Sequence, residues 1–93
     1  MIAPLRTTKI RQICRVQTRQ RKYITACVDT VRRASSALQI HLITQMRAIG
    51  INCPEILGEH RKLFEELREQ AALKDYCQAA LDVIERRRYS VAM

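Results

Sequence analysis

The chain has very few residues that favour turns, and this scarcity limits the folds open to it. Its 93 residues include only two glycines and two prolines. With one phenylalanine, three tyrosines and no tryptophan, the core must be built mainly from aliphatic side chains. Apolar residues recur three and four positions apart, which is the spacing of one face of an α-helix. We therefore expect an all-α fold in a single domain that spans residues 1–93.

The clearest break in the helical pattern follows a run of apolar residues that ends near the middle of the chain. Gly50 suits the residue just after a helix, and Pro54 suits the first turn of the next helix. Pro4 lies in a short segment without periodicity, which predicts a loose arm. The predicted segments are a loose arm (1–8), a basic helical region (9–49, with a break near 17–22 as an alternative), a turn (50–53) and a second long helix (54–88).

Ser35 and Ser36 mark a second place where the first helical region could break. Ser36 followed by Gln39 fits a capping box, which would divide the region into helices near 24–34 and 37–49. Two residues are short for the turn of a helix-turn-helix motif, and serine is tolerated on a helix surface. We therefore favour a continuous helix.

Two long helices joined by a short link form an antiparallel hairpin, here with a basic N-terminal extension. Such a hairpin buries too little surface alone, and several apolar residues lie away from its main seam. These residues are Ile40, Ile43, Met46, Leu73 and Val83. We therefore expect the hairpin to associate with a copy of itself, as a dimer or larger helical bundle, or to dock on a larger protein. Ile40, Ile43 and Met46 are the candidate apolar contacts.

Basic residues are concentrated in the first half of the chain. Residues 1–49 carry ten Lys/Arg and one Asp, whereas residues 50–93 carry seven Lys/Arg and eight Asp/Glu. The whole chain has a formal net charge of +8. Like charges at this density repel one another unless an acidic group lies against them. The sequence therefore predicts an anionic partner.

Four basic residues form the sharpest local pattern, because on a helix they lie within about 80° of one another. They are Arg11, Arg15, Arg19 and Lys22, and together we call them the basic ridge. Three interpretations are open: contact with a partner, neutralisation by glutamates of the second helix within the fold or a dimer, and simple solvation. Arginine suits the first, because its planar guanidinium binds phosphate or carboxylate through two hydrogen bonds. Arg32 and Arg33 form a smaller cluster of candidate charged contacts.

No spacing of residues in the sequence indicates catalysis, a cofactor or a metal site. The four cysteines, Cys14, Cys27, Cys53 and Cys77, include no close pair of the kind that binds zinc. We interpret them as small buried hydrophobic residues in a reducing compartment, with a disulfide as the alternative. His41 and His60 lie on or beside apolar helix faces and are interpreted as core residues. We therefore expect neither an enzyme nor a small-molecule substrate.

These features predict a non-enzymatic interaction protein, such as an adaptor, inhibitor or regulator, that binds an acidic surface of a partner. The alternative is a nucleic-acid-binding protein that contacts the phosphate backbone, because few aromatic residues accompany the ridge for base stacking. A membrane-surface role is disfavoured, since the apolar face of the basic helix lacks Trp, Phe and Leu. We expect a cytoplasmic location, with a mitochondrial one as the alternative, because the N-terminus is rich in Arg and Thr and free of acids.

Overall fold

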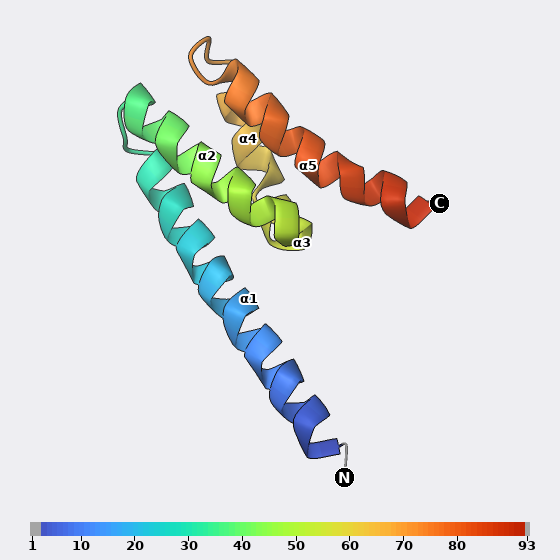
Figure 1. Ribbon diagram of the computed structural model, residues 1–93. Coiled ribbons are helices and arrows are strands. Elements are labelled where there is room, and N and C mark those ends of the chain that lie inside the picture. The colour runs from blue at the N-terminus through green and yellow to red at the C-terminus, as the bar shows by residue number, and fades with distance from the viewer. Residues whose placement is uncertain (1–2, 93) are drawn as a thin grey trace.

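The computed structural model describes the backbone of residues 3–92 and the side chains of residues 15–86 (Figure 1). Within these residues the chain forms α-helices and turns without a strand, so the predicted all-α class is confirmed. The helices are α1 (Ala3–Val31), α2 (Ser36–Asn52), α3 (Pro54–Gly58), α4 (Arg61–Leu67) and α5 (Lys74–Ala92).

The first helical region is divided in two, and the continuous helix expected over 9–49 is wrong. α1 ends at Val31 and α2 begins at Ser36, so the chain breaks at the alternative position, Ser35–Ser36. Ser35 is extended, with φ −65° and ψ 160°. Gln39 is 8% exposed, and its Nε2 donates a hydrogen bond of 2.7 Å to the carbonyl of Val31. Gln39 therefore caps the helix before it, because it binds a carbonyl that the end of α1 leaves without a helical partner.

The N-terminal part of α1 also differs from the expectation. Of residues 1–8, expected as a loose arm, residues 3–8 belong to α1, and residues 1–2 lie outside the described residues. The helix continues through residues 17–22 without the alternative break. Pro4 is compatible with this start, because the N–H groups of the first turn have no helical acceptor.

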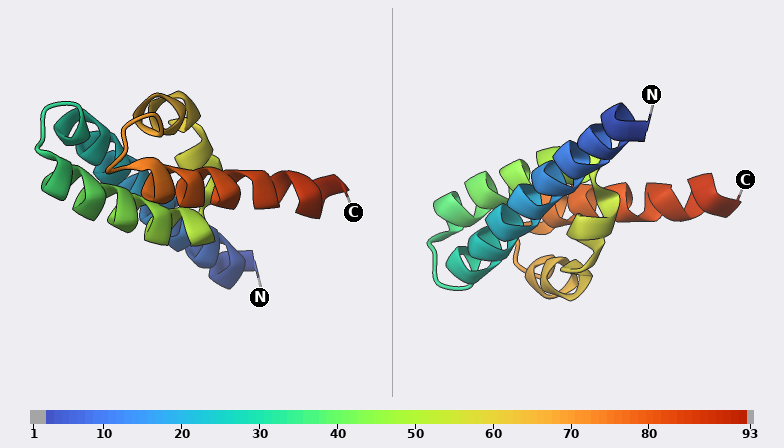
Figure 2. Two further views of the ribbon diagram at one scale, coloured as in Figure 1. Left: turned by 90° about the horizontal axis from the view of Figure 1, so that it is seen from above. Right: turned by 90° about the horizontal axis from the view of Figure 1, so that it is seen from below.

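The second long helix expected over 54–88 is also wrong, because α3, α4 and α5 occupy this range as separate helices. α4 and α5 are joined by residues 68–73, in which successive turns bring Leu73 to a fully buried position. The turn allows α5 to pack along α2 (Figure 2). The simple two-helix hairpin is therefore replaced by a five-helix arrangement within the described residues.

Gly50 allows a close approach between α2 and α3 and does not end a helix. α2 continues to Asn52, and Gly50 lies within it without a positive φ. A Cβ atom at Gly50 would lie 3.0 Å from both Cβ and Cγ of Leu57 in α3. The predicted turn over 50–53 is therefore reduced to Cys53, and Pro54 begins α3 as expected.

α2 occupies the centre of the fold and contacts α1, α3 and α5. Ile43 and Met46 have no exposed surface, and Leu73 and Val83 are buried at 0% and 9% exposure. The apolar residues outside the expected hairpin seam are therefore mostly covered by the chain's own helices. Self-association stays a prediction, without the exposed apolar seam on which it was based.

α1 extends beyond the packed helices at its N-terminal side (Figures 1 and 2). The Cα atoms span 56 × 32 × 16 Å, and the thin dimension fits two layers of helices with axes about 8–10 Å apart. Among the described side chains of α1, the first buried one is Ile24, and residues 15–19 are all exposed. None of the described helices is both long and apolar enough to cross a membrane.

Candidate partner-binding surface

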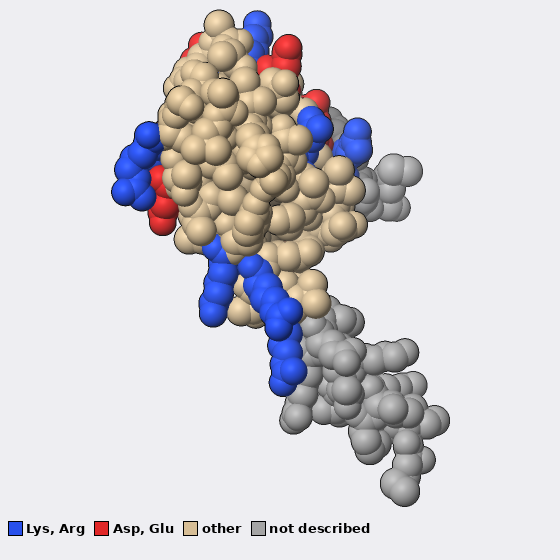
Figure 3. Space-filling view, turned by 60° about the vertical axis from the view of Figure 1, so that its left-hand side comes forward, with Lys and Arg blue, Asp and Glu red and all other residues tan. Residues whose placement is uncertain are grey.

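The described members of the basic ridge lie on the solvent-facing side of α1, opposite the side that packs on the helical body. Arg15, Arg19 and Lys22 are exposed, and Figure 3 shows basic side chains that project from the lower edge of the body. At 100° per residue they face away from the buried residues of α1, which are Ile24, Cys27, Val28 and Val31. The side chain of Arg11 lies outside the described residues. The packing of α1 therefore directs the ridge toward solvent.

Three glutamates of the second half of the chain pair with other arginines. Arg21 binds Glu59 through two hydrogen bonds, from Nη2 at 2.9 Å and from Nε at 3.3 Å, and these bonds raise the pKa of Arg21. Arg61 binds Glu65 at 2.9 Å and Glu85 at 2.8 Å. Within the described side chains, no ion pair involves Arg15, Arg19 or Lys22. The structure therefore gives no support to neutralisation of these three residues by the second half of the chain.

Arg32 and Arg33 form a cluster that is separate from the ridge. Both are exposed in the turn after α1, and Nε of Arg33 donates to the backbone carbonyl of Asp29 at 3.3 Å. Arg33 follows Lys22 by 11 residues, or about 16 Å of helix. Asp29 lies on the same face between them, so the basic surface is interrupted there.

The packing of α2 covers the apolar residues that were predicted to contact a partner. Ile43 and Met46 are fully buried, and Ile40 is half-buried against the core. All three belong to, or pack against, the core that α2 forms with α1, α3 and α5. Ile43 and Met46 therefore have no surface with which to contact a partner in this fold.

Other apolar and uncharged residues line the exposed side of the contact between α1 and α2. The Tyr23 hydroxyl donates to Oε1 of Gln45, whose Nε2 lies 3.0 Å from Nε2 of His41. Val16, Tyr23 and Leu38 are 52%, 42% and 42% exposed. We define the uncharged strip as Val16, Tyr23 and Thr30 of α1 with Leu38 and Gln45 of α2. Figure 3 shows a wide face of the body that is almost free of charged side chains.

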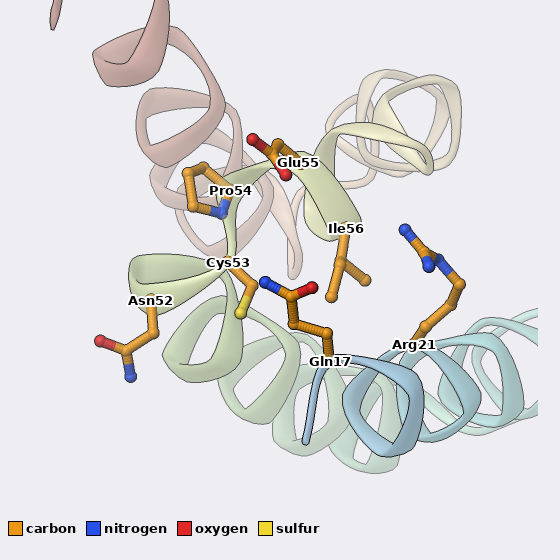
Figure 4. Close-up of a pocket in the computed structure, with 7 residues that line it drawn as sticks. All are labelled: Gln17, Arg21, Asn52, Cys53, Pro54, Glu55 and Ile56. Carbon is orange, nitrogen blue, oxygen red and sulfur yellow. The ribbon is translucent and has the colours of Figure 1, made fainter. Parts of the chain in front are cut away.

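A small cavity of about 170 Å³ lies between α1 and the junction of α2 and α3 (Figure 4). Its lining residues are Gln17, Arg21, Asn52, Cys53, Pro54, Glu55 and Ile56. The half-buried thiol of Cys53 donates to Oε1 of Gln20 at 2.8 Å. Arg21, on the wall, is already bound to Glu59, and the other polar lining groups are the Cys53 thiol, the Glu55 carboxylate and the amides of Gln17 and Asn52.

The thiols of the described cysteines are free, and two are buried. Burial raises the pKa of Cys77 to about 11 and also raises the pKa of Cys27. The neutral thiol is a weak nucleophile, so these positions suit the predicted role of small core residues. Among the described residues, no group of three or more His, Cys, Asp or Glu side chains could hold a metal ion.

Comparison with protein-family models, curated proteins and solved structures finds no match for this chain.

Proposed function

We propose that this chain is a non-enzymatic interaction protein that binds an acidic surface of a partner macromolecule through the basic ridge. The main support is the position of Arg15, Arg19 and Lys22, which are exposed on the side of α1 opposite its buried face. No acidic residue pairs with them within the described side chains.

The energetics of the ridge favour an external acidic partner. Like charges three or four positions apart destabilise a helix by about 0.2–0.5 kcal/mol per pair. Carboxylates or phosphates of a partner would remove this repulsion and accept charge-assisted hydrogen bonds from the guanidinium groups. A basic surface also increases the rate at which an acidic partner is captured, most strongly at low salt. Such a protein acts as an adaptor, inhibitor or regulator by occupying its partner's surface. The buried free thiols suit a reducing compartment such as the cytoplasm.

Charge reversal tests this proposal. The variant Arg15→Glu with Arg19→Glu should capture far less acidic protein from a nuclease-treated cell lysate than the native chain. The matched control is Lys62→Glu with Lys74→Glu, because it changes the net charge equally at exposed sites on α4 and α5. Equal capture by the native chain and both variants would reject a role for the ridge.

Nucleic acid is the second candidate partner, favoured by the burial of Ile43 and Met46, which leaves charge as the more prominent feature of the surface. A projecting helix also fits the major groove of duplex DNA, which is about 12 Å wide. Binding to phosphates is strongly salt-dependent, with a log–log slope of about −0.9 per contact. Three ridge contacts thus predict a slope near −3, whereas a protein interface with apolar contacts would depend less on salt.

A further inference from the structure

We infer that the partner presents an amphipathic helix with one acidic side and one apolar side. Its carboxylates would lie on Arg15, Arg19 and Lys22, and its apolar side chains would lie on the uncharged strip. This inference rests on the proposed function and specifies the class of partner.

The ridge and the uncharged strip form one continuous surface, because Arg19 of the ridge lies next to two residues of the strip. Arg19 lies three residues after Val16 and four residues before Tyr23, and residues at these separations are neighbours on a helix surface. Tyr23 in turn is hydrogen-bonded to Gln45 of α2. The α1 residues of the uncharged strip lie between the ridge and α2. A partner bound to the ridge would therefore also contact the strip.

The dimensions of this surface suit a helix of a partner protein. From Val16 to Thr30 the strip extends over 14 residues of α1, or about 21 Å. A partner helix of about 14 residues, or four turns, would cover this length. Leu38 lies seven residues before Gln45, on the same face of α2, with 42% of its surface exposed. Acidic and apolar residues on adjoining sides of the partner helix would match the two halves of the surface.

The apolar half of the surface favours protein over nucleic acid or lipid headgroups. Half-exposed Val16 and Leu38 gain from burial against apolar side chains, and a phosphate backbone offers none. Tyrosine is enriched at the centres of protein interfaces, where its ring packs and its hydroxyl keeps a polar partner. In Tyr23 the hydroxyl already has that partner in Gln45, which leaves the exposed ring for packing.

Selection from a helical peptide library tests the inference directly. We would select binders to the full chain from displayed 18-residue helical peptides with randomised surface positions. The inference predicts enrichment of peptides with Glu or Asp on one side and Leu, Ile or Phe on the adjoining side. Scrambling an enriched peptide, with its net charge kept, should weaken binding at least tenfold. Equal binding of the scrambled form would overturn the inference.

Two pairs of variants locate the binding surface. Leu38→Asp and Arg19→Glu should each weaken the enriched peptide at least tenfold in fluorescence anisotropy. Ile51→Asp is the apolar control, because Ile51 is 63% exposed but lies beside α5. Lys62→Glu is the charge control, and neither control should change binding more than twofold. Circular dichroism confirms that each variant folds, and an unchanged affinity in Leu38→Asp would overturn the inference.

The same assay with a 20-base-pair DNA duplex and with phosphatidylserine vesicles separates this inference from the proposed function. If DNA or vesicles bind more tightly than every selected peptide and Leu38→Asp has no effect, the inference fails. Loss of that binding in Arg15→Glu with Arg19→Glu would still support the ridge as an anion-binding surface. If no peptide, duplex or vesicle binds in a ridge-dependent way, both fail.

Discussion

Replacement of Gly50 by alanine gives a sharp test of the packing between α2 and α3. Gly50 is buried within α2, and its φ is not positive, so alanine meets no backbone strain there. The added Cβ would lie 3.0 Å from Cβ and Cγ of Leu57, closer than ordinary van der Waals contact. Leu57 is fully buried, and its Cβ cannot move by side-chain rotation. Relief of the clash therefore requires a shift of α3 away from α2.

Two opposing effects determine the size of the change. Gly→Ala inside a helix stabilises by about 1 kcal/mol through helix propensity. An extra methyl group in a well-packed core costs about 1–3 kcal/mol. Because the clash involves Leu57 Cβ as well as its flexible end, we take the upper part of that range. The expected net loss is about 1–2 kcal/mol, or a fall in Tm of roughly 5–15 °C for a domain of this size.

Thermal and urea unfolding followed by circular dichroism would measure this loss. Gly58→Ala is the matched control, because its Cβ would meet only Ile84 Cγ2, at an ordinary 3.8 Å. The control should be neutral or stabilising by up to about 1 kcal/mol. A rise in Tm for Gly50→Ala that equals or exceeds the rise for Gly58→Ala would refute the close approach of α2 and α3.

Three further predictions concern the core. Ile43→Ala should lower the free energy of unfolding by about 2–5 kcal/mol in urea titrations, because Ile43 is fully buried; a change below 1 kcal/mol would place it at the surface. Gln39→Ala should cost about 1–2 kcal/mol and speed amide exchange near residue 31, since the Val31 carbonyl keeps only the longer bond from the Ala34 N–H, at 3.4 Å; unchanged exchange and stability would contradict the cap. Burial raises the pKa of Cys77 from about 9 to about 11, so the unfolded thiol ionises first as the pH rises. The contribution of the neutral Cys77 thiol to the free energy of unfolding should be fully present below pH 9. It should fall by up to about 2–3 kcal/mol toward pH 11, and Cys77→Ala should remove this part of the pH dependence.

Local patterns in the chain predicted the features that depend on local structure. The apolar spacing predicted helices, and the start of α3 at Pro54 follows from the fixed φ of proline. The helical positions of Arg15, Arg19 and Lys22 opposite the apolar face also followed from the sequence, because the period of 3.6 residues needs no tertiary contact.

Pairings between distant residues could not be obtained in this way. The Arg21–Glu59 ion pair joins residues 38 positions apart, and its formation depends on how α1 lies beside α3. The uncharged strip was missed for the same reason, because it combines Tyr23 of α1 with Leu38 of α2, which share one surface only through the packing of these two helices. Only the break at Ser35–Ser36 brings α2 back against α1 and leaves both residues partly exposed.

The sequence by itself determined the helical class, the uneven distribution of charge and which faces of each helix are apolar. Only the tertiary structure decided what covers those faces, and it placed Ile43 and Met46 against the chain's own helices. An apolar residue gains about the same free energy from burial against its own chain as against another, so periodicity cannot tell the two apart. The same holds for Gly50, whose role as a site of close approach depends on where α3 packs.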